Sequence, residues 1–339
     1  MPLSSPAPVQ SMTPPLVDAY HRAITYMRIS ITDRCNLRCV YCMPEAGLDW
    51  MRHLLTDDDI LRIVGVAARR GLKKVRITGG EPLVRPGVAA LLRRLAQVTG
   101  LSDLALTTNG VFLAEQAQDL YDAGLRRLNV SLDSLNPATF ARIVRRDLFD
   151  RVWEGIERAE RIGFAPIKIN VVLQRGINDH EMSDFIRLIF RKPYQIRFIE
   201  QMPCATWETW VRAYRPFTPI REEIEAQWGA MTPVPNAQHA GPAEVYALPG
   251  AMGTIGFIHA VSHDFCDRCN RIRLTADGKI RPCLFSEMAV DLLPALRADC
   301  DDATLDALLH QSLRIKPEYH ELDMLPREKM LATMVNIGG

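Results

Sequence analysis

Residues 26–43 read YMRISITDRCNLRCVYCM, a strand-like alternation that runs directly into three cysteines. Cys35, Cys39 and Cys42 have the spacing C-x3-C-x2-C. Thiolates select zinc, copper(I) or iron–sulfur clusters, and a structural zinc normally needs a fourth ligand close by. Three thiolates would leave one iron of a [4Fe-4S] cube open to a small molecule. The stretch therefore predicts a catalytic cluster, with a zinc site and three ordinary buried thiols as the alternatives.

The rest of the first 202 residues repeats a strand followed by a helix. Alternating segments lie at 73–78, 103–107, 126–131, 167–172 and 194–199, with amphipathic segments between them. Six strands separated by helices predict parallel βα units. No seventh or eighth unit is visible, so the predicted α/β fold is an incomplete (βα)6 TIM-like barrel over residues 23–202. Unusual residues such as Cys35, Gly79-Gly80-Glu81 and Ser131 follow the strands, on the face where barrel enzymes place their active sites.

Each predicted strand has one apolar face and one polar face. The apolar face must meet the helices, so the polar face is predicted to line the inside of the barrel. The cations on this polar face are Arg28, Arg76, Lys168 and Arg197. Buried cations are costly unless they are paired with anions. The pattern therefore predicts a wide cationic lumen that holds a multiply charged ligand.

A second cysteine group lies near the C-terminus. Its members are Cys266, Cys269 and Cys283. Asp277-Gly278 is a strong signal for a two-residue hairpin turn. Such a turn would pair Ala276 with Lys279 and bring Cys283 opposite Ile272, back beside Cys269. Three thiols are therefore predicted to meet again without a fourth cysteine.

Neighbours of this second group leave two interpretations open. His259 or His263 could complete a structural zinc site with the three thiols. Arg271 and Arg273 lie on one face of the predicted hairpin, near the proposed cluster. A cluster with two adjacent guanidinium groups is the favoured interpretation.

Composition limits the classes of partner. Among 339 residues, 41 Lys and Arg balance 40 Asp and Glu, which argues against a nucleic-acid or membrane partner. No apolar run approaches membrane-spanning length. Six of the eight cysteines are grouped, which indicates metal binding in a reducing, cytoplasmic compartment and leaves Cys204 and Cys300 as ordinary thiols. Residues 1–22 are proline-rich at their start and are predicted to be a disordered leader.

Four motifs together resemble one family. CNLRCVYC, Gly79-Gly80-Glu81-Pro82, the run CNRIRLT at 269–275 and the terminal Gly338-Gly339 are similar to the radical S-adenosylmethionine (SAM) enzymes. Within that superfamily they resemble the GTP 3′,8-cyclases of molybdenum cofactor biosynthesis. The resemblance runs from Tyr26 to Gly339, and residues 203–240 are left unassigned.

The resemblance implies the fold, the cofactors and the site residues. Residues 203–339 would form an α+β extension that closes the open side of the barrel. The two cysteine groups would hold two [4Fe-4S] clusters, and SAM would bind the open iron of the first. SAM would contact Tyr41, Gly80, Glu81, Ser131 and Met202. GTP would contact Arg28, Arg76, Thr107, Lys168, Arg197, Arg271, Ile272 and Arg273. Gly338 and Gly339 would enter the active site as catalytic residues.

The resemblance also implies a reaction and its partners. An electron from an unidentified reductant would cleave SAM, and the 5′-deoxyadenosyl radical would take hydrogen from C3′ of GTP so that C3′ adds to C8. The product would pass to the next enzyme, cyclic pyranopterin monophosphate synthase, and a homodimer is compatible with the sequence. The alternatives are a peptide maturase with an auxiliary cluster and a non-enzymatic zinc-binding protein.

Overall fold

The computed structural model describes residues 14–43, 49–204, 207–235, 241–262 and 265–320. Its first two thirds alternate strands and helices, as the sequence predicts. The strands are β1 (Tyr26–Ser30), β2 (Lys74–Thr78), β3 (Asp103–Thr108), β4 (Arg127–Ser131), β5 (Ile167–Leu173) and β6 (Gln195–Glu200). The helices are α1 (Asp57–Arg69), α2 (Val88–Leu95), α3 (Leu113–Asp122), α4 (Pro137–Val144), α5 (Phe149–Ile162) and α6 (Met182–Ile189). The six predicted strands are all present, within two residues at each end.

The remaining elements belong to the C-terminal third. They are α7 (Trp207–Ala213), α8 (Thr218–Trp228), β7 (Thr232–Pro233), β8 (Glu244–Ala247), β9 (Thr254–Ile258), β10 (Arg271–Leu274), β11 (Lys279–Arg281), β12 (Val290–Asp291), α9 (Leu293–Arg297) and α10 (Asp302–Arg314). One-turn 3-10 helices lie at Pro82–Val84, Asp179–Glu181 and Cys266–Arg268. The short strand β12 directly precedes α9.

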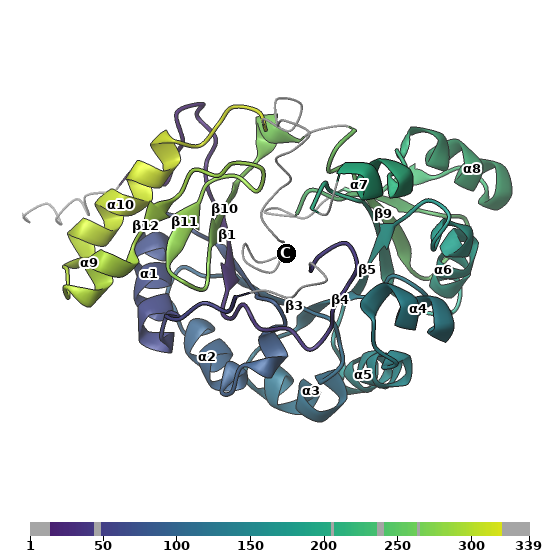
Figure 1. The fold of residues 1–339 in the computed structure, drawn as a ribbon, viewed down its shortest axis with the longest axis horizontal. Helices are drawn as coiled ribbons and strands as arrows, with labels where there is room; N and C mark the ends of the chain where they lie inside the picture. Colours follow the sequence, from purple (N-terminus) through teal and green to yellow (C-terminus); the bar gives the residue numbers. More distant parts are fainter. Residues whose placement is uncertain (1–13, 44–48, 205–206, 236–240, 263–264, 321–339) are drawn as a thin grey trace, which may run out of the picture.

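One curved sheet joins all of these strands in the order β12-β11-β10-β1-β2-β3-β4-β5-β6-β9-β8-β7. Strands β1 to β6 pair in parallel, and their helices cover the outside of the curve (Figure 1). Within the described residues the sheet is not closed into a ring, which confirms the incomplete barrel. Strand β10 adds to β1 and β9 adds to β6, both in parallel. The C-terminal third therefore extends both edges of the barrel sheet.

The first helix shows how local sequence sets an element. Thr56 caps α1 by accepting a hydrogen bond from the Asp59 amide, and the Asp59 carboxylate accepts one from the Thr56 amide. These two reciprocal hydrogen bonds form a capping box. On the other side, α1 carries Arg62 and Arg69, which pair with Asp302 at the start of α10. The last helix is thereby held against the first.

The hairpin between β10 and β11 differs from its prediction by one residue. Arg273 pairs with Arg281 and Leu274 with Ile280. The Thr275 amide then donates to the Lys279 carbonyl, which leaves the three residues 276–278 in the turn. Gly278 adopts φ +89°, as the last residue of such a loop requires. The predicted pairing of Ala276 with Lys279 is therefore wrong. Asp-Gly is compatible both with a two-residue hairpin turn and with a three-residue loop that ends in a left-handed glycine, and this hairpin has the three-residue loop.

The predicted disordered leader is wrong for its second half. Residues 1–13 lie outside the described part of the chain, but Leu16 and Arg22 are buried. Val17 forms an isolated bridge with Ala23, and the Leu16 amide bonds to the Arg70 carbonyl. Within residues 1–22, all of the prolines lie in the first fifteen positions, so the composition that indicates disorder does not extend to residue 22.

The two faces of the strands are arranged as the alternation predicts. Apolar residues such as Ile29, Ile77 and Phe198 are fully buried in the core beneath the helices. Arg28, Arg76 and other polar residues line a pocket on the inner face. In the described part of the chain, no helix is both long enough and apolar enough to cross a membrane.

Candidate active site

The pocket lies inside the curved sheet and brings together most of the predicted site residues. Those that line it are Arg28, Cys35, Cys39, Tyr41, Cys42, Arg76, Gly80, Glu81, Thr107, Ser131, Arg197, Met202, Cys266, Cys269, Arg271, Arg273 and Cys283. Both cysteine groups therefore face one cavity. Ile272 and Lys168 do not line it, and Gly338 and Gly339 lie outside the described residues.

The first cysteine loop is held by the turn after β2. The Gly80 amide donates to the Thr32 carbonyl at 2.7 Å, and the Glu81 amide donates to the Arg34 carbonyl at 2.7 Å. A Cβ at Gly80 would lie 2.4 Å from the Arg34 carbonyl oxygen. Only glycine permits the two loops to approach so closely. The turn thus fixes the backbone immediately before Cys35.

Glu81 organises the same end of the pocket. Its carboxylate accepts hydrogen bonds from the Thr108 hydroxyl at 2.7 Å and from the Asn109 amide at 2.6 Å. Burial raises the pKa of Glu81 to about 7, against the effect of these hydrogen bonds. The Asn109 side chain also donates to the Sγ of Cys35 at 3.8 Å. Glu81 therefore couples the end of β3 to the cysteine loop.

Tyr41 reaches across to the end of β4. Its hydroxyl donates to the Asp133 carboxylate at 2.6 Å, and the other carboxylate oxygen accepts from the Val172 amide at 2.8 Å. Burial raises the pKa of Asp133 to about 6. This network positions the residue between Cys39 and Cys42 against the barrel.

The second cysteine group flanks the β10–β11 hairpin, with Cys266 and Cys269 before β10 and Cys283 after β11. Cys266 and Cys269 flank a single 3-10 turn, in which the Cys269 amide donates to the Cys266 carbonyl at 3.2 Å. Burial raises the pKa of Cys269, but Arg271 and Lys316 outweigh burial and bring that pKa to about 7.

Each cysteine group brings three thiols to the pocket. All eight cysteines are free thiols. In the described residues no group of three or more Cys, His, Asp or Glu side chains could hold a single metal ion. The thiolates of a [4Fe-4S] cube bind different irons, so they need not converge on one point. His259, a proposed zinc ligand, packs against Phe217 and Phe257 and does not line the pocket, and His263 lies outside the described residues.

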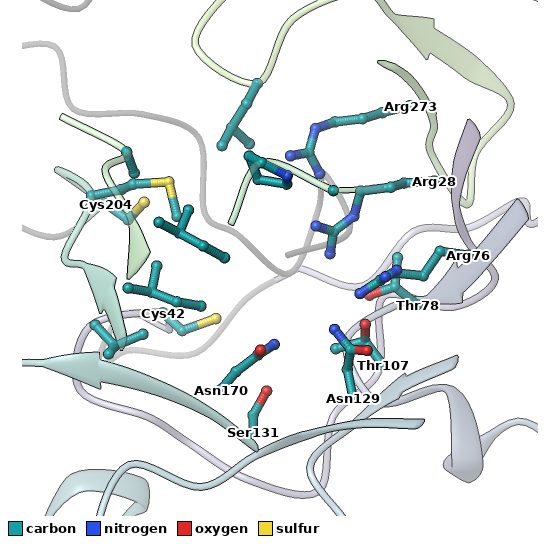
Figure 2. Close-up of a pocket in the computed structure, with 18 of the residues that line it drawn as sticks. Arg28, Cys42, Arg76, Thr78, Thr107, Asn129, Ser131, Asn170, Cys204 and Arg273 are labelled. Carbon is teal, nitrogen blue, oxygen red and sulfur yellow. The ribbon is translucent and has the colours of Figure 1, made fainter. Parts of the chain in front are cut away.

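Arginines line the wall of the pocket opposite Cys42 and Cys204. Figure 2 shows Arg273, Arg28 and Arg76 side by side on this wall. Arg28 pairs in register with Arg273 on one side and with Arg76 on the other. Burial, with a smaller contribution from the neighbouring Arg76, lowers the pKa of Arg28 to about 10. The wall is therefore a concentrated positive field inside the protein.

Several buried polar atoms on the floor of the pocket have no hydrogen-bond partner among the described residues. They include Nε of Arg76, Oγ1 of Thr107 and Oδ1 of Asn170. Buried polar groups in folded proteins are nearly always paired. Because all three residues line the pocket (Figure 2), these atoms are available to hydrogen-bond a polar ligand or water.

Comparison with known proteins agrees with this geometry. The family model of the radical SAM superfamily matches residues 29–189, and that of Molybdenum Cofactor Synthesis C matches residues 194–322. A GTP 3′,8-cyclase of Desulforamulus reducens is 43% identical over 327 residues, which cover 96% of this chain and all of that protein. One of Geobacter sulfurreducens is 44% identical over 326 residues, covering 96% and 99%.

The chain belongs to the GTP 3′,8-cyclase family.

Solved structures place the fold of this family member among radical SAM enzymes. Streptococcus suis SuiB bound to S-adenosylmethionine superposes with a TM-score of 0.60 at 16% identity, covering 84% of this chain and 68% of that one. The structure titled anSMEcpe with bound AdoMet gives a TM-score of 0.54 at 14% identity, covering 88% and 82%. At these identities the likeness supports the partial barrel alone.

Sequence reasoning missed several pocket residues of this cyclase-family chain, among them Tyr26 and Cys204. Tyr26 lines the pocket, and its ring lies under the Lys74 ammonium at 5.0 Å. The alternation that places Arg28 inside could have placed Tyr26 there too. Cys204 also lines the pocket, where burial raises the pKa of its thiol to about 12. No motif marks Cys204.

Two predicted substrate residues lie elsewhere. Ile272 is buried in the core, on the face of β10 opposite Arg271 and Arg273. Lys168 is the second residue of β5 and does not line the pocket, although its register partner Asn129 does. Burial and the nearby Arg197 lower the pKa of Lys168 to about 6. Lys168 is thus electrostatically coupled to the cationic wall without lining the pocket.

Proposed function

We propose that this chain is a radical SAM GTP 3′,8-cyclase, which converts GTP to (8S)-3′,8-cyclo-7,8-dihydroguanosine 5′-triphosphate in molybdenum cofactor biosynthesis. The observation that carries the proposal is a single pocket that contains two cysteine triads and a wall of arginines. The full-length similarity to proteins named GTP 3′,8-cyclase supports the same activity.

Cys35, Cys39 and Cys42 fit a [4Fe-4S] cluster, because three free thiols line one cavity beside a turn that only glycine can form. When bound, the cluster and SAM supply a 5′-deoxyadenosyl radical that takes hydrogen from C3′ of the substrate. The protein positions the reactants and excludes water. Gly80 and Glu81 would hold the methionine part of SAM, and Ser131 and Met202 would contact the rest.

The second triad would hold the auxiliary [4Fe-4S] cluster, which would supply a binding position for the guanine. Cys266, Cys269 and Cys283 line the same cavity as the first triad, which supports a role in substrate binding rather than a remote structural zinc. Arg271 and Arg273 lie between this triad and Arg28, so the triphosphate would extend along the arginine wall. Bidentate guanidinium contacts suit phosphate oxygens.

The other partners follow from the reaction class. A one-electron reductant in a reducing, cytoplasmic compartment would reduce the first cluster. Cyclic pyranopterin monophosphate synthase would take the product, and a homodimer is compatible with this function. The terminal Gly338-Gly339 would complete the active site.

The test is an iron count and a product assay on anaerobically purified protein. Replacing Cys35, Cys39 and Cys42 by alanine should halve the iron and abolish cleavage of SAM. Replacing Cys266, Cys269 and Cys283 by alanine should also halve the iron, but SAM cleavage should persist while the cyclised product is lost. Cys300→Ala, outside the pocket lining, is the matched control and should change neither.

Other outcomes would favour the alternatives. Stoichiometric zinc on the second triad would remove the auxiliary cluster from the proposal. Two clusters without any GTP affinity would favour a peptide maturase. Zinc on both triads and no SAM cleavage would favour a non-enzymatic zinc-binding protein.

A further inference from the structure

The segment after α10 runs beside the second cysteine group and sends one lysine into it. Lys316 is only 4% exposed. Its ammonium donates to the Pro282 carbonyl at 2.8 Å, to the Arg271 carbonyl at 3.0 Å and to the Sγ of Cys269 at 3.4 Å. Three acceptors satisfy the three donors of an ammonium group. Lys316 is therefore held in one orientation, with one of its hydrogens on a thiol.

A second buried cation fixes the same segment from the other side. Arg22 donates to the carbonyls of Pro317 and Glu318 at 2.6 Å each. The same guanidinium donates to the Cys266 carbonyl at 2.6 Å, and its Nε pairs with Asp18 at 2.6 Å. The backbone next to Lys316 is thus tied directly to the turn that contains Cys266 and Cys269.

Cys35 of the first triad and Cys269 of the second differ in the donors that reach their sulfur atoms. The Sγ of Cys35 accepts from the Leu37 amide at 3.4 Å and from the Asn109 side-chain amide at 3.8 Å, both neutral donors. The donor at Cys269 is a charged ammonium in a buried setting. Hydrogen bonds to ligand sulfurs and local charge help to set the potential of an iron–sulfur cluster.

We propose that Lys316 is a positioning residue for the second cluster and raises the reduction potential of that cluster. The inference rests on the proposed function, because it requires a cluster on Cys266, Cys269 and Cys283. Reduction adds one negative charge to the cluster, and a fixed ammonium at a ligand sulfur stabilises that charge in a low-dielectric site. Through the Arg271 carbonyl the same ammonium also fixes the strand that carries Arg271 and Arg273.

The experiment is an anaerobic redox titration of the full-length protein, followed by electron paramagnetic resonance. Each variant is also prepared with Cys35, Cys39 and Cys42 replaced by alanine, so that the signal comes from the second cluster alone. Lys316→Met should shift the midpoint potential to a more negative value. Lys316→Arg, which keeps the charge, should recover most of the shift.

Lys279→Met is the matched control. Lys279 lies in the β10–β11 hairpin that the second triad flanks, but its side chain is half-exposed and its ammonium pairs with Asp277 at 2.7 Å. The potential of this variant should equal that of the unaltered protein. An unchanged potential in Lys316→Met with full iron on the second triad would overturn the inference. If the methionine variant loses that iron, Lys316→Gln replaces it, and an unchanged potential there has the same meaning. Iron for one cluster only in the unaltered protein would instead refute the proposed auxiliary cluster.

Discussion

Arg28 on β1 and Arg76 on β2 are register partners on adjacent parallel strands, and both line the pocket. Arg273 on β10 is the register partner of Arg28 on its other side. Like charges placed directly opposite each other destabilise a sheet. A triphosphate between these side chains would turn their repulsion into attraction. The wall is therefore built for an anion with several charges.

Arg76→Ala should weaken GTP binding by about 1.5–3 kcal/mol, the value of a hydrogen bond to a charged group. SAM affinity should change far less, since Arg76 is part of the arginine wall and lies across the pocket from Cys42 (Figure 2). Calorimetry with each ligand measures both effects. Arg93→Ala, on the exposed side of α2, is the control. Guanosine that binds as tightly as GTP would show that the wall does not bind phosphate.

GTP binding should take up a proton at Lys168. The pKa of Lys168 is lowered to about 6, so its amine is largely neutral at pH 7 in the free protein. The negative charge of GTP raises that pKa again, and the amine gains a proton as the complex forms. Calorimetry at pH 7 in buffers of different ionisation enthalpy gives the number of protons taken up. Lys168→Met should lower it, and Lys279→Met should not; equal values in all three proteins would contradict the prediction.

Tyr26 should ionise at an unusually low pH. Burial alone would raise the pKa of Tyr26, but Arg76 and Arg28 outweigh it and lower that pKa to about 8. The absorbance difference between the unaltered protein and Tyr26→Phe should therefore rise between pH 7 and 9. Adding GTP should move this rise to higher pH, because phosphate charge opposes phenolate formation. A phenol that titrates near 10, with or without GTP, would argue against the coupling.

Gly80→Ala should destabilise the protein and impair binding of the first cluster. The new Cβ would meet the carbonyl oxygens of Arg34 and Asp33 at 2.4 and 2.6 Å, so the cysteine loop must move. Overpacking of this kind costs about 1–3 kcal/mol. Gly65→Ala inside α1 is the control and should stabilise the protein by about 0.5–1 kcal/mol. Chemical denaturation and iron content together test this; a stable Gly80→Ala with full iron would disprove it.

Deleting Gly338 and Gly339 should leave both clusters and the affinity for GTP largely intact. The variant should still cleave SAM but fail to form the cyclised product. These residues lie outside the described part of the chain, and the expectation rests on the family resemblance. Product analysis by chromatography measures the effect. Normal product from the shortened protein would remove any catalytic role for the tail.

The barrel was predictable because a parallel strand and its helix leave a strong local pattern. Alternation alone predicts that Arg28, Arg76 and Arg197 lie on the inner face, where they line the pocket. Lys168 alternates like these cations, and its register partner Asn129 lines the pocket, yet Lys168 does not. Alternation therefore does not say which inward side chains reach the cavity.

Features set by distant contacts were not predictable. Strands β9 and β10 join the parallel sheet without helices of their own, so they add no strand–helix repeat to the sequence. The ammonium of Lys316 reaches Cys269 across 47 residues of chain, with no motif to announce it. Such contacts depend on how the C-terminal third folds back on the barrel.

The attachment of β9 and β10 to opposite edges of the barrel also constrains the order of events during synthesis. A nascent chain that ends near residue 202 contains β1 to β6 with both outer strands uncovered. Unpaired parallel edges are sites of misassociation between chains. Neither edge is covered until residues 254–274 have left the ribosome. Both edges of the barrel sheet are therefore covered only late in synthesis, and chaperone dependence should fall sharply once the hairpin that carries β10 has been made.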